Sequence, residues 1–149
     1  MCVIVDANQL GKFIKPNAPP GIVRLREWVE SRGKIIYPTS GQFADELHSH
    51  GEAKKKLAEY VKKGKAKVVD GQACENAARE FKNQVINSDD AHILGLAKVA
   101  RVTVLCTKDD DLKGDFKRLI NGGKIYPDSE TYPNSERDQR RMLDRKICP

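Results

Sequence analysis

Four acidic residues stand at positions where a carboxylate could take part in catalysis. Asp6 and Asp109 each follow a short apolar run directly or within a few residues, whereas Asp90 opens an apolar helical pattern and Glu46 lies inside another. In open α/β sheets, ligands bind outside the carboxyl ends of the strands, and helices begin at the same edge. We therefore expect these four carboxylates to converge on one cleft.

Carboxylates gathered in one cleft repel one another unless cations are bound between them. Clusters of oxygen ligands suit Mg²⁺ or Mn²⁺, which accept carboxylates and keep several waters. Two such ions can activate a water molecule and stabilise the leaving oxygen when a phosphodiester is cleaved. The acids therefore predict metal-dependent phosphodiester hydrolysis, with Mg²⁺ or Mn²⁺ as the cofactor.

Two of these acids also have a plain structural interpretation. Asp6 could cap the turn that follows the first apolar run. Glu46 stands beside Asp45, and the surface of a helix commonly carries solvated acids.

The remaining acids lie in short charged runs. Ser88 is expected to cap the following helix, and both Asp89 and Asp90 could then interact with its dipole, so that the pattern alone does not choose between them. The run at residues 109–111 is typical of a solvated loop, from which at least one acid could face the cleft. Asp115 is expected on a helix surface rather than among the ligands.

Short apolar runs alternate with longer helical patterns along the chain, which is typical of a parallel sheet covered by helices. The expected strands are residues 2–5, 34–37, 67–70, 102–106 and 124–126. The expected helices are residues 21–32, one or two helices between 41 and 62, 74–85, 88–100 and 112–120. We predict an α/β fold, a three-layer α/β/α sandwich around a central parallel sheet of four to five strands.

The composition fits a globular domain. The chain has 149 residues, of which 32% are charged and 39% hydrophobic, and its net charge is +6, so a collagen-like or disordered chain is excluded. No apolar run approaches the roughly 18–20 residues that span a bilayer, and the first ten residues lack a basic region, so no signal peptide or membrane association is expected. Four widely spaced cysteines match no zinc template and indicate reduced thiols in a cytoplasmic protein.

Two segments carry motifs that are more specific than composition. Residues 3–8 are VIVDAN, a strand that ends in an acid and an asparagine. Residues 87–116 are NSDDAHILGLAKVARVTVLCTKDDDLKGDF, in which Asp90 opens a helix of the form D-A-x-I-x-x-x-A and the next strand ends in T-x-D, from Thr107 to Asp109. Together these segments resemble the PIN-domain nucleases, a family that includes many VapC-type toxins of bacterial toxin–antitoxin pairs.

A third segment extends the resemblance. Residues 34–47, KIIYPTSGQFADEL, are similar to the second strand of that family and the helix that carries its acidic residue. The similarity favours Glu46 over Asp45, because the glutamate of the family commonly stands directly before leucine. In all, the resemblance covers roughly residues 1–127 and implies a PIN-like nuclease domain there, followed by a polar C-terminal extension at residues 128–149.

The resemblance implies an endoribonuclease that hydrolyses phosphodiester bonds with a metal-activated water. The implied acidic set that holds Mg²⁺ or Mn²⁺ is Asp6, Glu46, Asp90 and Asp109. Asp111 is an additional candidate ligand, because some relatives carry an acid there. Thr107 would supply a hydroxyl that orients a carboxylate or water, and Asn8 would be a polar support nearby. RNA is favoured over DNA because most relatives cut RNA; an antitoxin protein and a homodimer are the implied protein partners.

Lysines gather in one stretch of the middle of the chain. The candidates for binding nucleic acid are Lys54, Lys55, Lys62, Lys63 and Lys65. They could form a track for a phosphate backbone, which gives affinity without sequence discrimination, or simply a solvated helix face. Tyr60 is the only aromatic residue among them, so a stacking platform for single strands has little support.

Two functions of other classes stay open. A non-catalytic RNA-binding or regulatory α/β domain would keep the fold without turnover. A receiver-like phosphoacceptor domain would need an aspartate at the end of the third strand, for which Asp70 is the candidate, but Asp6 is followed by alanine where that class has a second acid.

Overall fold

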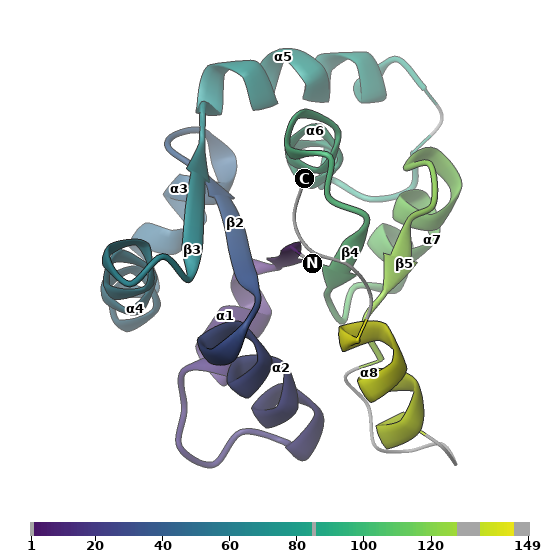
Figure 1. Cartoon of the computed structure of the whole chain (residues 1–149). Helices are drawn as coiled ribbons and strands as arrows, with labels where there is room; N and C mark the ends of the chain where they lie inside the picture. Colours follow the sequence, from purple (N-terminus) through teal and green to yellow (C-terminus); the bar gives the residue numbers. More distant parts are fainter. Residues whose placement is uncertain (1, 85, 128–134, 145–149) are drawn as a thin grey trace.

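A single all-parallel sheet of five strands forms the centre of the molecule (Figure 1). The computed structural model describes residues 2–84, 86–127 and 135–144. The strands are β1 Cys2–Val5, β2 Lys34–Pro38, β3 Ala66–Val69, β4 Val104–Cys106 and β5 Lys124–Ile125. The helices are α1 Ala7–Phe13, α2 Pro20–Ser31, α3 Gln42–His48, α4 Gly51–Lys62, α5 Gly71–Lys82, α6 Ala91–Ala100, α7 Asp110–Leu119 and α8 Ser135–Leu143.

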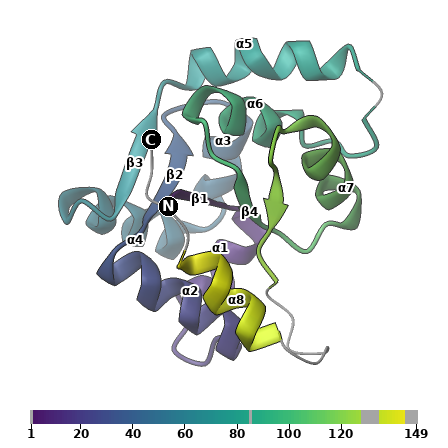
Figure 2. The same ribbon diagram turned by 45° about the vertical axis from the view of Figure 1, so that its right-hand side comes forward.

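The strand order is β3-β2-β1-β4-β5. From β1 the chain moves outward through β2 to β3, then crosses to β4 and moves outward the other way to β5. Crossovers between parallel strands are right-handed, so the two directions put their helices on opposite faces. Helices α1, α2 and α4 therefore cover one face, and α5, α6 and α7 the other (Figures 1 and 2). This arrangement confirms the predicted three-layer α/β/α sandwich.

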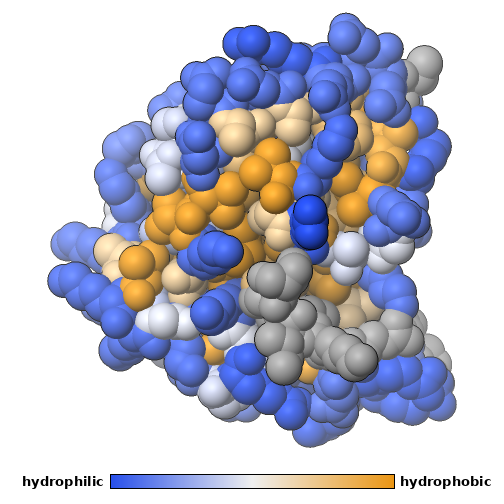
Figure 3. Space-filling model, turned by 45° about the horizontal axis from the view of Figure 1, so that its top comes forward, coloured by the Kyte–Doolittle hydropathy of each residue, from blue (hydrophilic) through white to orange (hydrophobic). Residues whose placement is uncertain are grey.

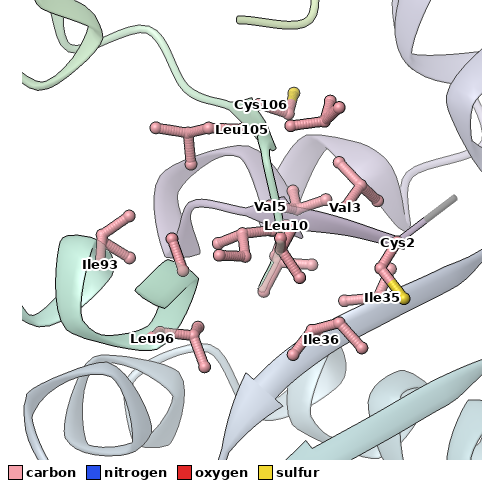
Figure 4. Close-up of a cluster of buried hydrophobic side chains, with 14 of the residues drawn as sticks. Cys2, Val3, Val5, Leu10, Ile35, Ile36, Ile93, Leu96, Leu105 and Cys106 are labelled. Atoms are coloured by element: carbon pink, nitrogen blue, oxygen red, sulfur yellow. The ribbon is translucent and has the colours of Figure 1, made fainter. Parts of the chain in front are cut away.

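The central strand β1 is buried along its whole length, as a strand covered on both faces must be. Val3, Ile4 and Val5 have no exposed surface. Figure 4 shows Val3 and Val5 among side chains from β2, β4, α1 and α6, which form one core. On the outside, hydrophilic residues surround a band of hydrophobic ones that crosses the middle of the face in Figure 3.

Helix α6 lies unusually close to α5 because of a glycine. A Cβ on Gly95 would stand 2.3 Å from the carbonyl oxygen of Cys74 and 2.7 Å from the backbone nitrogen of Ala78. Only a glycine permits this approach of two backbones. Since α6 begins directly after Asp90, its packing on α5 also places one end of the candidate site.

The predicted strands agree with the structure to within two residues at each end, and the segment between residues 41 and 62 is a pair of helices, α3 and α4, one of the two predicted alternatives. The helices show three differences. Helix α5 spans Gly71–Lys82 rather than residues 74–85. Helix α1 was not expected, because seven residues with a glycine inside give too little periodicity. Ser88 does not cap α6: the helix begins at Ala91, after Asp90.

The C-terminal helix α8 packs against α2 (Figure 2). Arg24 Nη1 donates to Gln139 Oε1 at 2.5 Å, and Arg32 Nη2 lies 2.6 Å from Asp144 Oδ1. The hydroxyl of Tyr126, which precedes this region, donates to the carbonyl of Gly21 at 2.6 Å. The other parts of the expected polar extension, residues 128–134 and 145–149, lie outside the described residues.

The cysteines differ in state. Cys74 and Cys106 are buried and carry reduced thiols, as expected. Cys2 is disulfide-bonded, so the expectation is wrong at that position; Cys148 lies outside the described residues. Among the helices of the described part of the chain, none is long and apolar enough to cross a membrane.

Candidate metal centre

The carboxyl ends of β1 and β4 meet where the chain changes direction across the sheet. The backbone N–H of Asp6, directly after β1, donates to the carbonyl of Cys106 at the end of β4, at 2.9 Å. In doubly wound sheets, ligands bind in the crevice at this kind of topological switch. The sheet therefore places its natural binding site between the segments that follow β1 and β4.

Thr107 joins these two segments. Its Oγ1 donates to Asp6 Oδ2 at 2.8 Å and accepts the backbone N–H of Asp109 at 3.2 Å. Asp6 is only 5% exposed and Thr107 is fully buried. The hydroxyl thus fixes the orientation of the Asp6 carboxylate, which agrees with the positioning role expected of Thr107.

Asp109 begins α7. One of its carboxylate oxygens, Oδ1, accepts the N–H of Leu112 at 3.1 Å, so the residue caps the helix. Its side chain also lies near enough to Asp90 to raise the pKa of that residue. The same carboxylate therefore serves the helix and reaches the cluster.

Asp90 lies where the four acids meet. The pKa of Asp90 is raised from 3.8 to about 7, chiefly by burial. The charges of Asp6, Asp109 and Glu46 contribute the next parts of this increase, in that order. Burial also raises the pKa of Asp6, against the opposing hydrogen bond from Thr107 and with a contribution from the charge of Glu46. The four acids thus influence the ionisation at Asp90, while the ligand atoms shown within 4.8 Å of one another belong to Glu46, Asp90 and His92.

Glu46 reaches the cluster from α3, which contacts α6. Its Oε1 accepts from Gln42 Nε2 at 3.2 Å, and its Oε2 lies 3.8 Å from His92 Nε2. Asp45, the neighbouring alternative, is exposed. Of the two acids, Glu46 is therefore the one directed toward Asp90.

His92 was not expected at the site. Its side chain is 10% exposed, and Nε2 lies 3.8 Å from Glu46 Oε2 and 3.9 Å from Asp90 Oδ1. Neither ring nitrogen has a hydrogen-bond partner among the described residues. Burial lowers the pKa of His92 to about 4, so the ring is neutral near pH 7. Ligand atoms of Glu46, Asp90 and His92 lie within 4.8 Å of one another, an arrangement that could hold a metal ion. The only sequence signal for His92 was its position two residues after Asp90.

Two further candidates, Asp111 and Asn8, lie outside the cluster of acids. Asp111 is exposed in the first turn of α7, and no contact between it and the cluster is present in the described residues. Asn8 is exposed and lines a pocket of about 440 Å³ between α1 and the start of α4. Its neighbour Gln9 is buried, with an Oε1 that has no partner, and sequence analysis overlooked it.

Asp115 is not a surface residue as expected, but is fully buried. Its carboxylate accepts the N–H of Asn87 at 3.0 Å and that of Ser88 at 2.9 Å, and Arg118 Nη2 lies 3.1 Å away. Burial would raise the pKa of Asp115, but the hydrogen bonds from Ser88 and Asn87 outweigh it and hold the pKa below its ordinary value. Asp115 thereby ties α7 to the loop that leads into Asp90.

The candidate lysines are divided between the two ends of α4. Lys54 and Lys55 lie in its first turns, near the carboxyl edge of the sheet, and Lys54 Nζ is 3.1 Å from His48 Nδ1. Lys62, Lys63 and Lys65 lie before the amino end of β3, at the opposite edge. Lys65 Nζ donates to the carbonyl of Ser31 at 3.2 Å.

Other basic residues lie nearer the acids. Arg79 and Lys82 of α5 line a pocket of about 200 Å³ together with Gln42 and His92. Glu75 also borders this pocket. A cavity with two exposed cations therefore opens beside the acidic cluster.

Comparison with known proteins adds no assignment: no family model, curated protein or solved structure matches this chain. The class of the molecule is thus defined by its own fold and site. It is a doubly wound α/β domain with a cluster of four acids and one histidine at the topological switch of its sheet.

Proposed function

We propose that this protein is a metal-dependent endoribonuclease, similar to the PIN-domain nucleases, that hydrolyses phosphodiester bonds with Mg²⁺ or Mn²⁺. The observation that carries the proposal is geometric: ligand atoms of Glu46, Asp90 and His92 lie within 4.8 Å of one another. Thr107 holds Asp6 and Asp109 together beside them. Carboxylates gathered in this way repel one another unless a cation is bound between them.

The residues present fit a divalent cation. Asp6, Glu46, Asp90 and Asp109 would hold it, and the unpartnered nitrogens of His92 face the same space. A bound cation supplies Lewis acidity, which lowers the pKa of a coordinated water and stabilises the leaving oxygen. The positive charge of the cation would also let RNA approach carboxylates that would otherwise repel it.

The protein's own side chains have separable tasks in this proposal. Thr107 orients the carboxylate of Asp6 through its hydroxyl. Asp90 and Glu46, whose ligand atoms lie within 4.8 Å of each other, would hold the cation from α6 and α3. Arg79 and Lys82 offer positive charge to a phosphate of the substrate in the adjoining pocket.

RNA as the substrate, a toxin role, an antitoxin that covers the cleft and a homodimer all follow from the resemblance to the PIN-domain family, whereas a cytoplasmic location follows from the widely spaced cysteines. All are part of the same proposal, and those that follow from the resemblance rest on the motifs around Asp6, Asp90 and Asp109. The basic net charge of +6 agrees with a polyanionic partner.

The test is cleavage of RNA by the wild-type protein and by Asp6→Asn and Asp90→Asn. We expect cleavage to need Mg²⁺ or Mn²⁺ and to fall at least about a hundred-fold in each variant, because a metal ligand and a negative charge are lost. Asp45→Asn and Asp89→Asn, each adjacent to a proposed ligand, are the matched controls and should retain activity. Cleavage that persists in both site variants, or in the presence of a chelator, would contradict the mechanism.

The same assay separates the alternative functions. RNA that is bound but never cleaved with either metal would indicate a non-catalytic RNA-binding domain. The receiver-like alternative has no support in the topology, since receivers have the strand order 2-1-3-4-5. Asp70, its candidate phosphoacceptor, lies after the edge strand β3 and caps α5 by accepting the N–H of Gln72 at 3.0 Å.

A further inference from the structure

His92 is the least satisfied polar side chain at the site. Nine-tenths of the side chain is removed from solvent, and both ring nitrogens are buried without a hydrogen-bond partner among the described residues. Burying a polar group without a partner costs free energy, on the order of 1–3 kcal/mol as judged from mutations in proteins. The ring packs edge-to-face on Phe43, with a centroid distance of 6.5 Å. An apolar ring could make the same contact and would avoid the cost of burying two nitrogens.

The position of Nε2 suggests what satisfies it. This atom lies 3.8 Å from Glu46 Oε2 and 3.9 Å from Asp90 Oδ1, too far for hydrogen bonds. Bonds from nitrogen or oxygen ligands to a divalent metal are about 2.0–2.2 Å long, so one ion can lie between ligand atoms up to about 4.4 Å apart. Both separations fall within this limit.

We propose that His92 Nε2 is a metal ligand and that, with Glu46 and Asp90, it forms a mixed nitrogen–oxygen site that binds Mn²⁺ in preference to Mg²⁺. The inference rests on the proposed function in that the same acids hold the metal. It goes further by adding a ligand and a selectivity that the acids alone do not give.

The selectivity follows from ligand chemistry. Mg²⁺ takes oxygen ligands, keeps several waters and loses them reluctantly, so an imidazole contributes little to its binding. First-row transition metals accept imidazole nitrogen, and their affinities for mixed sites exceed that of Mg²⁺. The site therefore discriminates against Mg²⁺ rather than among the transition metals.

The experiment measures metal binding to the full chain in the absence of RNA. Calorimetric titrations with Mn²⁺ and with Mg²⁺ compare the wild-type protein with His92→Phe, which keeps a ring against Phe43 but removes both nitrogens. We expect the wild type to bind Mn²⁺ at least about ten-fold more tightly than Mg²⁺, and His92→Phe to lose most of this preference while its Mg²⁺ affinity changes less than about two-fold.

A spectroscopic measurement tests the bond itself. Pulsed electron paramagnetic resonance of the Mn²⁺-loaded protein should show coupling to a ¹⁴N nucleus, and this coupling should be absent in His92→Phe. His48→Gln, at the exposed C-terminal end of α3, is the control for imidazoles that do not face the site and should leave the coupling unchanged.

A second variant guards against loss of folding. His92→Gln places an amide oxygen near the position of Nε2, and should bind Mn²⁺ without nitrogen coupling and with the weaker preference of an all-oxygen site. Thermal melts in chelator establish that each variant is folded. Equal Mn²⁺ affinity in wild type and His92→Phe, no nitrogen coupling, or no binding of Mn²⁺ would each overturn the proposal.

The outcomes separate this inference from the ribonuclease proposal. Nitrogen coupling without RNA cleavage supports the metal site and contradicts the nuclease. Metal-dependent cleavage lost in Asp90→Asn, with Mn²⁺ binding that does not depend on His92, supports the nuclease and contradicts the histidine ligand.

Discussion

The protonation of Asp90 depends on whether a cation is bound at the site. Its pKa of about 7 means that the metal-free protein holds a proton at a site where a metal would replace it. Metal binding near neutral pH therefore releases a proton. The carboxylate is costly to ionise chiefly because it is buried, and further because the charges of neighbouring acids are uncompensated.

A pH dependence of stability follows for the metal-free protein. In the unfolded chain Asp90 ionises near its ordinary pKa of 3.8, whereas in the folded protein it ionises near 7. As pH rises between these values, only the unfolded form gains the favourable ionisation, so the free energy of unfolding falls. Asp90→Asn removes this loss and should be more stable than wild type above about pH 7, by on the order of 1–3 kcal/mol, with the advantage disappearing below about pH 4.

The measurement is urea unfolding in chelator at several pH values, expressed as the difference between variant and wild type. The difference is needed because His92 acts in the opposite direction: its pKa is lowered from 6.5 to about 4, so its contribution to stability is lost as pH falls through that range. Asp89→Asn serves as the control for an exposed acid one residue away. A variant-to-wild-type difference that is constant with pH contradicts the prediction.

For single residues, the sequence predicted the four acids but not the side chains that surround them in the fold. Asp6 and Asp109 are recognisable because they follow apolar strands, and Asp90 because it opens an apolar helix. His92 and Asp115 depend on which side chains from distant segments surround them. Nothing in local spacing shows that His92 would face Glu46 from another helix.

Among the elements, α7 and the loop before α6 act together through Asp115. Its carboxylate accepts two backbone N–H groups of that loop, at Asn87 and Ser88. This explains why Ser88 is not the cap of α6: its N–H bonds to α7, and the chain reaches helical geometry only after Asp90. The expected cap was wrong because a contact between distant segments outweighed a local preference.

Removing this carboxylate should therefore weaken the fold. Asp115→Ala leaves the buried N–H of Ser88 and the partly buried N–H of Asn87 without their acceptor, and we expect a loss of about 2–4 kcal/mol in the free energy of unfolding. Asp110→Ala, an exposed acid on the same helix, should cost less than about 0.5 kcal/mol. Urea unfolding of the two variants gives the comparison, and equal losses would count against a structural role for Asp115.

The strands and most helices were predictable because their apolar patterns are strong and their ends carry glycine or proline. Helix α1 was not, since its buried positions Ala7, Leu10 and Phe13 span fewer than two turns. The alternation of elements predicted a parallel sheet, but strand order depends on which crossovers pack best and is not written in any local pattern. The crevice between β1 and β4 emerged only with that order.

For the whole molecule, the distribution of positive charge matters more than its sum. Helix α4 separates Lys54 and Lys55, on the side of the acids, from Lys62 and Lys63 at the opposite edge. Twelve residues of helix are about 18 Å long, which at about 3.4 Å per nucleotide along one strand corresponds to roughly five nucleotides. If the lysines form one track, its far end is reached only by a long RNA.

Charge reversal tests the track. Lys62→Glu/Lys63→Glu should weaken the binding of a long RNA and reduce its salt dependence by about two charges, yet leave a tri- or tetranucleotide unaffected. Lys54→Glu/Lys55→Glu should weaken both. The measurement is the dissociation constant as a function of salt concentration, with a site variant such as Asp90→Asn used to prevent cleavage. Equal effects of both pairs on the short RNA would contradict this orientation.

The hydrogen bond between Thr107 and Asp6 joins segments that are 101 residues apart in the chain. Contacts of such long range form late in folding, after the loops between them have closed. A cation held by Asp6 and Asp109 would therefore stabilise the native state much more than the folding transition state. It would lengthen the lifetime of the folded protein by slowing unfolding, while the rate of folding stayed nearly the same.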